Sequence, residues 1–340
     1  MTRLALVMIA RDEAHQIARA LDSAAPFVDL MIVLDTGSVD ATREIARARG
    51  AVVQAFAWCD DFAAARNASL DLSPAAWNLV LDADEWIESG GEALAALESD
   101  AMGWVRRDNQ LEGGAVAQTW IPRVLPRGVR YEGRIHEQPV GLERGVRLPV
   151  LLGHDGFTAE SLARKGDRNE FLLMADLRDR PQDPYLWFQL AKEHQARGRR
   201  PQAALCFSEA LRLAPAEAPW RHSLVVRGLT ALKDAGQLKE ARVLAEVERA
   251  AWSRSPDFHF AVGDLYLQCA MADPERALSE LLPVAEAAWK TCLEIGEQPH
   301  LDGSVRGRGS FMAAHNLATL YETFGPKAAA APYRELAAAR

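Results

Sequence analysis

Four short, nearly uninterrupted apolar runs near the start of this 340-residue chain constrain its fold more than any other feature. The runs are residues 4–9, 30–34, 51–53 and 77–81, and segments with helical spacing follow the first two, at 12–23 and 40–49. Strands that are apolar on both faces and alternate with helices are typical of βαβ units, whose parallel sheet is covered on both sides. Gly50 follows the second helix as its expected C-terminal cap. The first part of the chain is therefore predicted to be an α/β domain.

Residues 102–155 carry a looser pattern of arginines, glycines and short β-like runs such as 116–121. This pattern is typical of a mixed sheet edge with functional loops. We therefore expect the α/β domain to span residues 1–155.

The chain is helical from about residue 180 and contains a repeat. When Trp187 is placed fourth in a 34-residue unit, the residues that follow resemble the tetratricopeptide pattern, with a histidine in place of its tyrosine. The matching residues are Leu190, Ala191, His194, Ala203, Phe207, Ala210 and Pro215. Weaker units run through 228–245 and 317–337, whereas 256–300 is helical without holding the period. We expect an all-α tetratricopeptide-like domain at 181–340, after a connecting helix at 156–180, with its apolar side chains in the core.

The composition argues against several classes of protein. Apolar residues make up 49% and charged residues 25% of the chain, which is the balance of a globular protein. The 47 acidic and 39 basic residues give a net charge of −8, so we expect no nucleic-acid partner. The first expected strand is not followed by G-x-G-x-x-G, and no G-x-x-x-x-G-K-[ST] occurs, which argues against a dinucleotide-dependent dehydrogenase and a P-loop enzyme.

The cysteines and the apolar runs indicate a cytoplasmic protein. The four cysteines, at 59, 206, 269 and 292, show neither C-x-x-C pairs nor zinc-like spacing, so we expect reduced, buried thiols. The first apolar run is too short for a signal peptide, and no run approaches the roughly 18–20 apolar residues of a membrane span. We therefore expect no membrane partner.

Acidic side chains follow three of the expected strands at the point where each strand ends. The charged and polar residues at these positions are Arg11, Asp12, Glu13, Asp35, Thr36, Gly37, Ser38, Asp40, Asp82, Asp84 and Glu85, with Asp60, Asp61 and Arg66 between the third and fourth strands. In open α/β sheets, ligands bind beyond the carboxyl ends of the strands. Asp40 and Asp61 also stand where helix N-caps are expected, and capping alone would account for these two.

Capping does not account for Asp82 and Asp84, because both follow an apolar strand and must share one site. Like charges placed together need a cation to relieve their repulsion, and a hard divalent metal with oxygen ligands suits them. The sequence therefore predicts a metal site here, with a solvated acidic turn as the alternative.

Four sequence blocks resemble those of family 2 glycosyltransferases, and they occur in that family's order. They are residues 8–13 (MIARDE), 33–40 (VLDTGSVD), 60–67 (DDFAAARN) and 81–85 (LDADE). The likeness is strongest to the branch that joins this catalytic domain to a tetratricopeptide tail, which includes peptide glycosyltransferases that modify bacteriocin precursors on cysteine. The sequence departs from the commonest block at Val39, where threonine is usual.

The resemblance implies a GT-A fold, a single Rossmann-like α/β domain that binds a UDP-sugar. It also implies that Glu13 and Asp35 contact the uracil and ribose and that Arg66 lies near the diphosphate. Asp82 and Asp84 match the D-x-D pair that binds Mn²⁺ or Mg²⁺, and a late histidine, here His154, is the expected third metal ligand. The residues expected at the nucleotide sugar are Ala10, Arg11, Glu13, Asp35, Gly37, Ser38, Arg66, Asp82, Ala83 and His136.

Family 2 members invert the anomeric centre, so the resemblance implies one general base, usually a carboxylate. Glu137, in the polar segment GRIHEQ at 133–138, is the favoured base, and Asp108 is its rival. His136 is expected to orient the base or to contact the diphosphate.

Two groups of basic residues remain outside these blocks. Arg123, Arg130 and Arg134 either hold phosphates or solvate a sheet edge, and residues 306–309 (RGRG) are expected to form a solvated linker between helices.

Together these features predict an enzyme that transfers a sugar from a UDP-sugar to a peptide or protein, with the tetratricopeptide groove holding the acceptor. The alternatives are a non-catalytic scaffold with a degenerate sugar-nucleotide domain and a glycosyltransferase with a carbohydrate acceptor. The helical faces at 316–340 either cap the array or pair with a second copy, which would give a homodimer.

Overall fold

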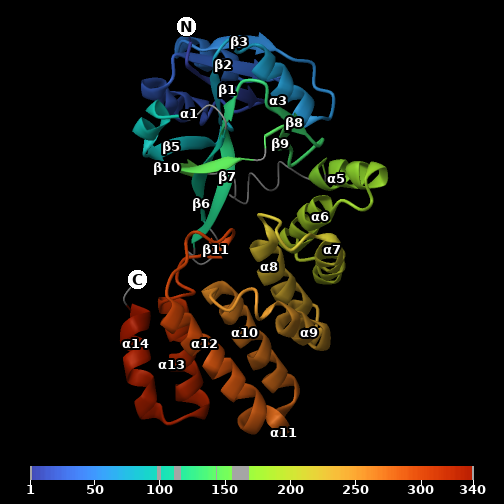
Figure 1. Ribbon diagram of the computed structural model, residues 1–340, viewed down its shortest axis with the longest axis vertical. Helices are drawn as coiled ribbons and strands as arrows, with labels where there is room; N and C mark the ends of the chain where they lie inside the picture. The colour runs from blue at the N-terminus through green and yellow to red at the C-terminus, as the bar shows by residue number, and fades with distance from the viewer. Residues whose placement is uncertain (1, 98–100, 111–115, 143, 155–167, 339–340) are drawn as a thin grey trace. The chain divides into compact units, whose positions relative to one another are not determined.

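The computed structural model describes residues 2–97, 101–110, 116–142, 144–154 and 168–338. The chain forms two compact units, and Figure 1 shows the strands and helices of each. The first unit comprises Met1–Gln110 and Thr119–Asp176, and the second comprises Leu111–Gln118 and Leu177–Arg340.

The first unit is built around a mixed sheet. Its strands are β1 (Leu4–Ala10), β2 (Leu30–Asp35), β3 (Val52–Ala55), β4 (Trp77–Val80), β5 (Glu85–Ser89), β6 (Met102–Gln110), β7 (Val116–Pro126) and β10 (Gly145–His154), hydrogen-bonded in the order β3-β2-β1-β4-β7-β6-β10-β5. β1 pairs in parallel with β2 and β4, and β2 with β3, as the apolar runs predicted. β7 then pairs antiparallel with β4, which makes the sheet mixed. A separate pair, β8 (Arg130–Glu132) and β9 (Gln138–Val140), lies outside this sheet.

Helices cover the sheet because both of its faces are apolar. They are α1 (Ile17–Ala24), α2 (Thr42–Ala48) and α3 (Phe62–Asp71), with 3₁₀ turns η1 (Ala25–Phe27) and η2 (Gly91–Ala95). Most of α5 (Arg168–Asp179) also belongs to the first unit. Leu6, Met8 and Leu79 from β1 and β4 are fully buried in one cluster with Ile17 and Leu21 of α1. Burial of each such side chain stabilises the fold by roughly 1.5–3 kcal/mol.

Two predicted helix ends are confirmed and one predicted start is wrong. Asp61 caps α3, accepting a hydrogen bond from the Ala64 N–H, and Gly50 follows α2 with a φ of 80°. However, α1 begins at Ile17 and not at residue 12. Asp12 has a φ of 57°, outside the helical region, and the N–H of Glu13 donates to a side chain beyond β2.

The second unit is mainly a stack of antiparallel helices (Figure 1). They are α6 (Pro184–Ala196), α7 (Arg200–Leu213), α8 (Arg221–Asp234), α9 (Leu238–Glu248), α10 (Pro256–Ala272), α11 (Pro274–Arg276), α12 (Leu282–Ile295), α13 (Phe311–Phe324) and α14 (Ala331–Ala338), with the π-turn η4 (Ala277–Leu281) and the 3₁₀ turn η5 (Lys327–Ala330). α6 and α7 form the hairpin that the tetratricopeptide register predicted, with Leu190, Ala203 and Phe207 buried. The register therefore identified the core positions of this hairpin correctly.

The prediction of a solvated linker at 306–309 is wrong. β11 (Ser304–Val305) pairs with Ala117 and Gln118, which belong to the same unit. Arg308 forms an ion pair with the buried Asp257, with 3.1 Å between Nη1 and Oδ1. The segment is held in place because its charged side chain has a buried partner.

The cysteines and helices test two further expectations. Cys206, Cys269 and Cys292 are buried free thiols, as predicted, whereas Cys59 is exposed. None of the helices in the described part of the chain is both long and apolar enough to span a bilayer.

Candidate active site

The loops that follow β1 and β2 are tied together by side-chain hydrogen bonds to backbone N–H groups. Asp12 N–H donates to Ser38 Oγ at 3.0 Å, and Val39 N–H donates back to Asp12 Oδ1 at 2.7 Å. The N–H groups of Glu13 and Ala14 donate to Thr42 Oγ1 at 2.8 Å and Asp40 Oδ2 at 3.0 Å. Because β1 and β2 are parallel neighbours, their carboxyl ends meet and these contacts fix one rim of the sheet.

Asp35 lies at this rim but is 1% exposed. Its carboxylate accepts hydrogen bonds from Gly37 N–H at 3.3 Å and Ser38 N–H at 3.2 Å. Gly37 has a φ of 110°, a backbone conformation that residues with a side chain rarely adopt. The carbonyl of Ala10 is likewise used, since it accepts from Thr36 N–H at 2.9 Å. Asp35 and Ala10 therefore shape the loop that was predicted to contact the nucleoside.

The remaining residues predicted at this rim differ in exposure. The Arg11 side chain is 54% exposed, with Nε 3.9 Å from Asp12 Oδ2. Glu13 Oε2 accepts from Gln16 Nε2 at 2.5 Å, and Ala83 is a buried core residue.

Asp82, beyond the end of β4, is paired with two arginines. Arg66 of α3 and Arg123 of β7 both donate to its carboxylate, the latter from Nη2 to Oδ2 at 2.6 Å. Burial acts to raise the pKa of Asp82, but the charges of Arg123 and Arg66 hold it well below the usual value. The negative charge of Asp82 is thus balanced by two guanidinium groups.

A second carboxylate extends the cluster into the sheet. Glu85 is fully buried, and its Oε1 accepts from Arg123 Nη2 at 2.7 Å and from Arg107 Nη1 at 2.9 Å. Arg107 belongs to β6 and Arg123 to β7, and both side chains reach Glu85, so they lie on the same face of the sheet. The carboxylates of this cluster therefore meet guanidinium groups at short range, which offsets the cost of burying them.

Glu137, the favoured base, lies in the same cluster. Arg66 Nε donates to Glu137 Oε1 at 2.8 Å, and the side chains are 5% and 11% exposed. The Asn67 side chain holds β8 close by, because it exchanges two 2.9 Å hydrogen bonds with the backbone of Tyr131. Burial raises the pKa of Tyr131 to about 12, so its hydroxyl stays protonated near neutral pH.

Asp108, the rival base, lies on β6 and is not part of this cluster. It pairs with Arg106 on β6, with 3.1 Å between Nε and Oδ1. Side chains alternate along a strand, and Arg107 reaches Glu85, so Arg106 and Asp108 extend from the opposite face of β6. The structure brings Glu137 and not Asp108 to Asp82.

Asp84 and His154 form a pair at the ends of β4 and β10. His154 Nε2 is 3.4 Å from Asp84 Oδ2, and His154 is opposite Glu85 in the β5–β10 register. Among the residues that the structure describes, no three histidine, cysteine or acidic side chains are grouped as metal ligands. One carboxylate and one imidazole fit a divalent cation that takes its other ligands from water and phosphate.

The other predicted residues have structural partners. Arg130 pairs with Asp71 at 2.6 Å, and Arg134 pairs with the buried Asp176 at 2.9 Å. His136 has a φ of 51°, which is uncommon for a residue with a side chain. Arg130 and Arg134 thus stabilise the elements around the site through ion pairs.

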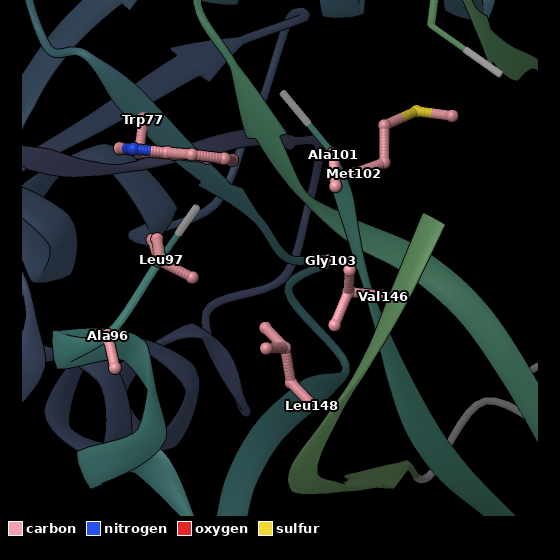
Figure 2. A pocket seen from close by; sticks show the side chains of 8 residues that line it. All are labelled: Trp77, Ala96, Leu97, Ala101, Met102, Gly103, Val146 and Leu148. Atoms are coloured by element: carbon pink, nitrogen blue, oxygen red, sulfur yellow. The ribbon is translucent and has the colours of Figure 1, made fainter. Parts of the chain in front are cut away.

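The structure also contains a small apolar cavity of about 50 Å³, shown in Figure 2. Trp77, Leu97, Met102 and Leu148 are among its lining residues. Trp77 is the first residue of β4, whereas Asp82 follows the end of that strand, so the cavity lies at the other end. Its size and apolar lining do not suit a nucleotide.

Sequence reasoning assigned no role to Arg107, Asn67 and Tyr131, and it left open whether Arg123 holds phosphates or solvates a sheet edge. A signal was present for Arg123, because it precedes the buried Val124 and Leu125 within one strand. A charged residue inside a buried strand requires a partner of opposite charge. Tyr131 and Asn67 carried no comparable signal.

Comparisons with known proteins agree with this architecture. Residues 5–107 match the family described as Glycosyl transferase family 2. A TPR repeat-containing protein of Synechococcus elongatus is 32% identical over 209 residues, covering 56% of this chain and 52% of that protein. The SPbeta prophage-derived glycosyltransferase SunS of Bacillus subtilis is 22% identical over 201 residues, covering 55% and 48%. The chain thus spans about half the length of the curated relatives it matches.

Solved structures overlap with a smaller part of the chain. A crystal structure of glucosyl-3-phosphoglycerate synthase from Mycobacterium tuberculosis, in complex with Mn²⁺, UDP and glucosyl-3-phosphoglycerate, is 24% identical, with a TM-score of 0.27. The overlap covers 31% of this chain and 43% of that one. Residues 5–107 are thus similar to Glycosyl transferase family 2 domains; the chain forms a mixed α/β sheet, followed in sequence by helices whose first hairpin has the tetratricopeptide pattern.

Proposed function

We propose that this protein transfers a sugar from a UDP-sugar to a peptide or protein acceptor, with inversion at the anomeric carbon and with Mn²⁺ or Mg²⁺. The observation that carries the proposal is the Asp84–His154 pair beside Asp82, at the strand ends where α/β sheets bind ligands, with both aspartates in the segment similar to family 2 glycosyltransferases. The peptide acceptor is supported by the helical unit, since stacked helical repeats present extended binding surfaces.

In this mechanism Asp84 and His154 would hold the metal, while the diphosphate supplies further ligands. A bound divalent cation supplies charge stabilisation for the departing nucleoside diphosphate. Asp82 would then face the nucleotide from a position fixed by Arg66 and Arg123. These preorganised guanidinium groups need no rearrangement as negative charge develops nearby.

Glu137 would accept the proton of the attacking acceptor group. Arg66 Nε donates to Oε1, and Oε2 has no hydrogen bond or ion pair with any described residue. The hydrogen bond at Oε1 therefore orients the Glu137 carboxylate, and Oε2 would accept the proton. Tyr131 stays neutral and protonated in the same cluster.

The test is release of UDP from a panel of UDP-sugars, without acceptor, with Mn²⁺ or with EDTA. We expect release from one donor, its loss with EDTA, and a decrease of about 100-fold or more in Asp84→Asn and His154→Gln. Asp22→Asn, at an exposed carboxylate paired with Arg49, is the matched control and should release UDP normally. If the protein neither binds UDP by calorimetry nor releases it, the non-catalytic scaffold is the correct alternative.

A further inference from the structure

Glu85, the first residue of β5, is hydrogen-bonded to both backbone polar groups of Asp82. The Asp82 N–H donates to Glu85 Oε2 at 3.1 Å, and the Asp82 carbonyl accepts from the Glu85 N–H at 3.0 Å. Ala83 and Asp84 form the turn between these two residues. Glu85 therefore closes the turn that carries Asp84.

The other oxygen of the Glu85 carboxylate is held by two arginines. Arg107 Nη1 and Arg123 Nη2 donate to Oε1 at 2.9 Å and 2.7 Å. Arg123 Nη2 also donates to Asp82 Oδ2 at 2.6 Å. Because Glu85 is fully buried, these charge-assisted bonds fix the position of its Oε2 against the backbone of the turn.

Glu85 is also connected to His154 through the sheet. β5 and β10 pair antiparallel, and Glu85 is opposite His154 in their register. His154 Nε2 in turn lies 3.4 Å from Asp84 Oδ2. One buried residue thus supports both proposed metal ligands, Asp84 through the turn and His154 through the β-ladder.

We infer that Glu85 is a positioning residue for Asp84 and His154. The inference rests on the proposed function, because these two residues are its proposed metal ligands. Glu85 itself faces two guanidinium groups and a backbone N–H, so it acts on the metal site only through the turn and the strand. Replacing groups that hold metal ligands in place typically lowers metal affinity by about 10- to 100-fold.

The contacts of Glu85 require a carboxylate of this length. All of its side-chain partners are donors, so the amide of a glutamine would direct its own N–H groups at a guanidinium or at the Asp82 N–H. A buried donor without an acceptor is costly, and the turn is expected to shift in response. An aspartate keeps the negative charge beside the arginines but is one methylene shorter, so it cannot maintain the contacts at both oxygens.

The experiment measures UDP binding to the whole chain by calorimetry, with Mn²⁺ and with EDTA. In the wild type we expect Mn²⁺ to tighten UDP binding. In Glu85→Gln and Glu85→Asp we expect this gain to decrease about tenfold or more, because the metal ligands are displaced. UDP affinity in EDTA should stay within about threefold of the wild type, since the loops after β1 and β2 do not depend on Glu85.

Asp257→Asn is the matched control. Asp257 is also a buried carboxylate paired with an arginine, Arg308, but it belongs to the second unit. This variant loses a buried ion pair and should keep the full gain from Mn²⁺. Melting temperatures from circular dichroism identify which variants are folded under the conditions of the binding measurement.

An unchanged gain from Mn²⁺ in the Glu85 variants overturns the inference. An equal loss of UDP affinity with Mn²⁺ and with EDTA also overturns it, because a residue that only stabilises the fold would weaken both. If neither variant folds, Glu85 is structural alone and the inference is wrong. A wild-type protein that does not bind UDP, or that binds it equally with Mn²⁺ and with EDTA, instead refutes the metal-dependent transfer proposed above.

Discussion

Arg66 joins Glu137 to Asp82: its Nε donates to Glu137 Oε1 at 2.8 Å, while Nη2 donates to Asp82 Oδ1. The two carboxylates come from segments 55 residues apart in sequence, and one side chain of α3 fixes both. Burial acts against the charged form of Arg66, but Asp82 and Glu137 together hold its pKa well above the usual value. Arg66 thus links two carboxylates of the site, while Arg123 also pairs with Asp82.

Replacing Arg66 should destabilise the first unit. In Arg66→Met Glu137 loses its ion-pair partner and Asp82 keeps only Arg123, in a largely buried cluster, and breaking a buried pair costs about 3–5 kcal/mol. We expect a clear decrease in melting temperature, measured by circular dichroism. Arg212→Met, at an exposed surface pair, should melt like the wild type. A wild-type melting temperature for Arg66→Met would show that the ion pairs contribute little to the folded state.

The two predicted bases can be separated by amide substitution. Glu137→Gln keeps the shape of the side chain but removes its proton-accepting charge, so we expect transfer to an acceptor, and hydrolysis, to slow by about 10²- to 10⁴-fold. Asp108→Asn changes a carboxylate on the opposite face of β6 and should slow the reaction by less than about threefold. Steady-state kcat distinguishes the two. A large loss in Asp108→Asn with little change in Glu137→Gln would reverse the assignment.

Asp264 should make stability depend on pH. Burial raises its pKa from 3.8 to about 6, with Lys233 and Arg308 acting in the other direction. Between about pH 4 and pH 6 the folded state therefore binds more protons than the unfolded state, so stability falls as pH rises through this window. The contribution is up to about 3 kcal/mol, because each pKa unit corresponds to about 1.4 kcal/mol.

The measurement is the melting temperature from pH 4 to pH 7 for the wild type and for Asp264→Asn. The amide cannot ionise, so the difference in stability should move in favour of the variant as pH rises. Asp273→Asn, at an exposed carboxylate, serves as the control. Parallel curves for the wild type and Asp264→Asn would contradict the prediction.

Gly309 tests whether the segment after β11 is packed. A Cβ at this position would lie 2.4 Å from the backbone of Gly296, and backbone atoms cannot move aside as a flexible side chain does. We expect Gly309→Ala to lose about 1–3 kcal/mol of stability by overpacking. Gly228→Ala is the control for alanine in the same unit, because its nearest neighbour is the end of the Leu211 side chain at 2.9 Å. Similar small losses in both variants would mean that the segment adapts easily.

The site was predictable in part, because strand ends are visible in the sequence but partners are not. The apolar runs ended at Asp35 and Asp82, which placed both residues at the carboxyl end of a parallel sheet. The role of Asp35 was not predictable in the same way: its carboxylate accepts hydrogen bonds from the N–H groups of its own loop. The sequence could not indicate this, because a buried aspartate and a ligand-binding aspartate have the same residue type.

The sequence alone determined the two kinds of architecture in this chain. Apolar runs that are buried on both faces require helices on both sides of a sheet, and the 34-residue register requires helical hairpins. These are local, periodic properties, so they are readable from neighbouring residues. They specified the strands from β1 to β4 and the hairpin of α6 and α7.

Tertiary structure decided which charges meet. Asp84 and His154 are 70 residues apart, and Arg308 and Asp257 are 51 apart, and their pairing follows from the positions of β10 and β11. The same long-range packing decided that Arg66 and Arg123 would neutralise Asp82. Coulombic energy depends on distance in space and on burial, and neither quantity is encoded in the spacing of residues along the chain.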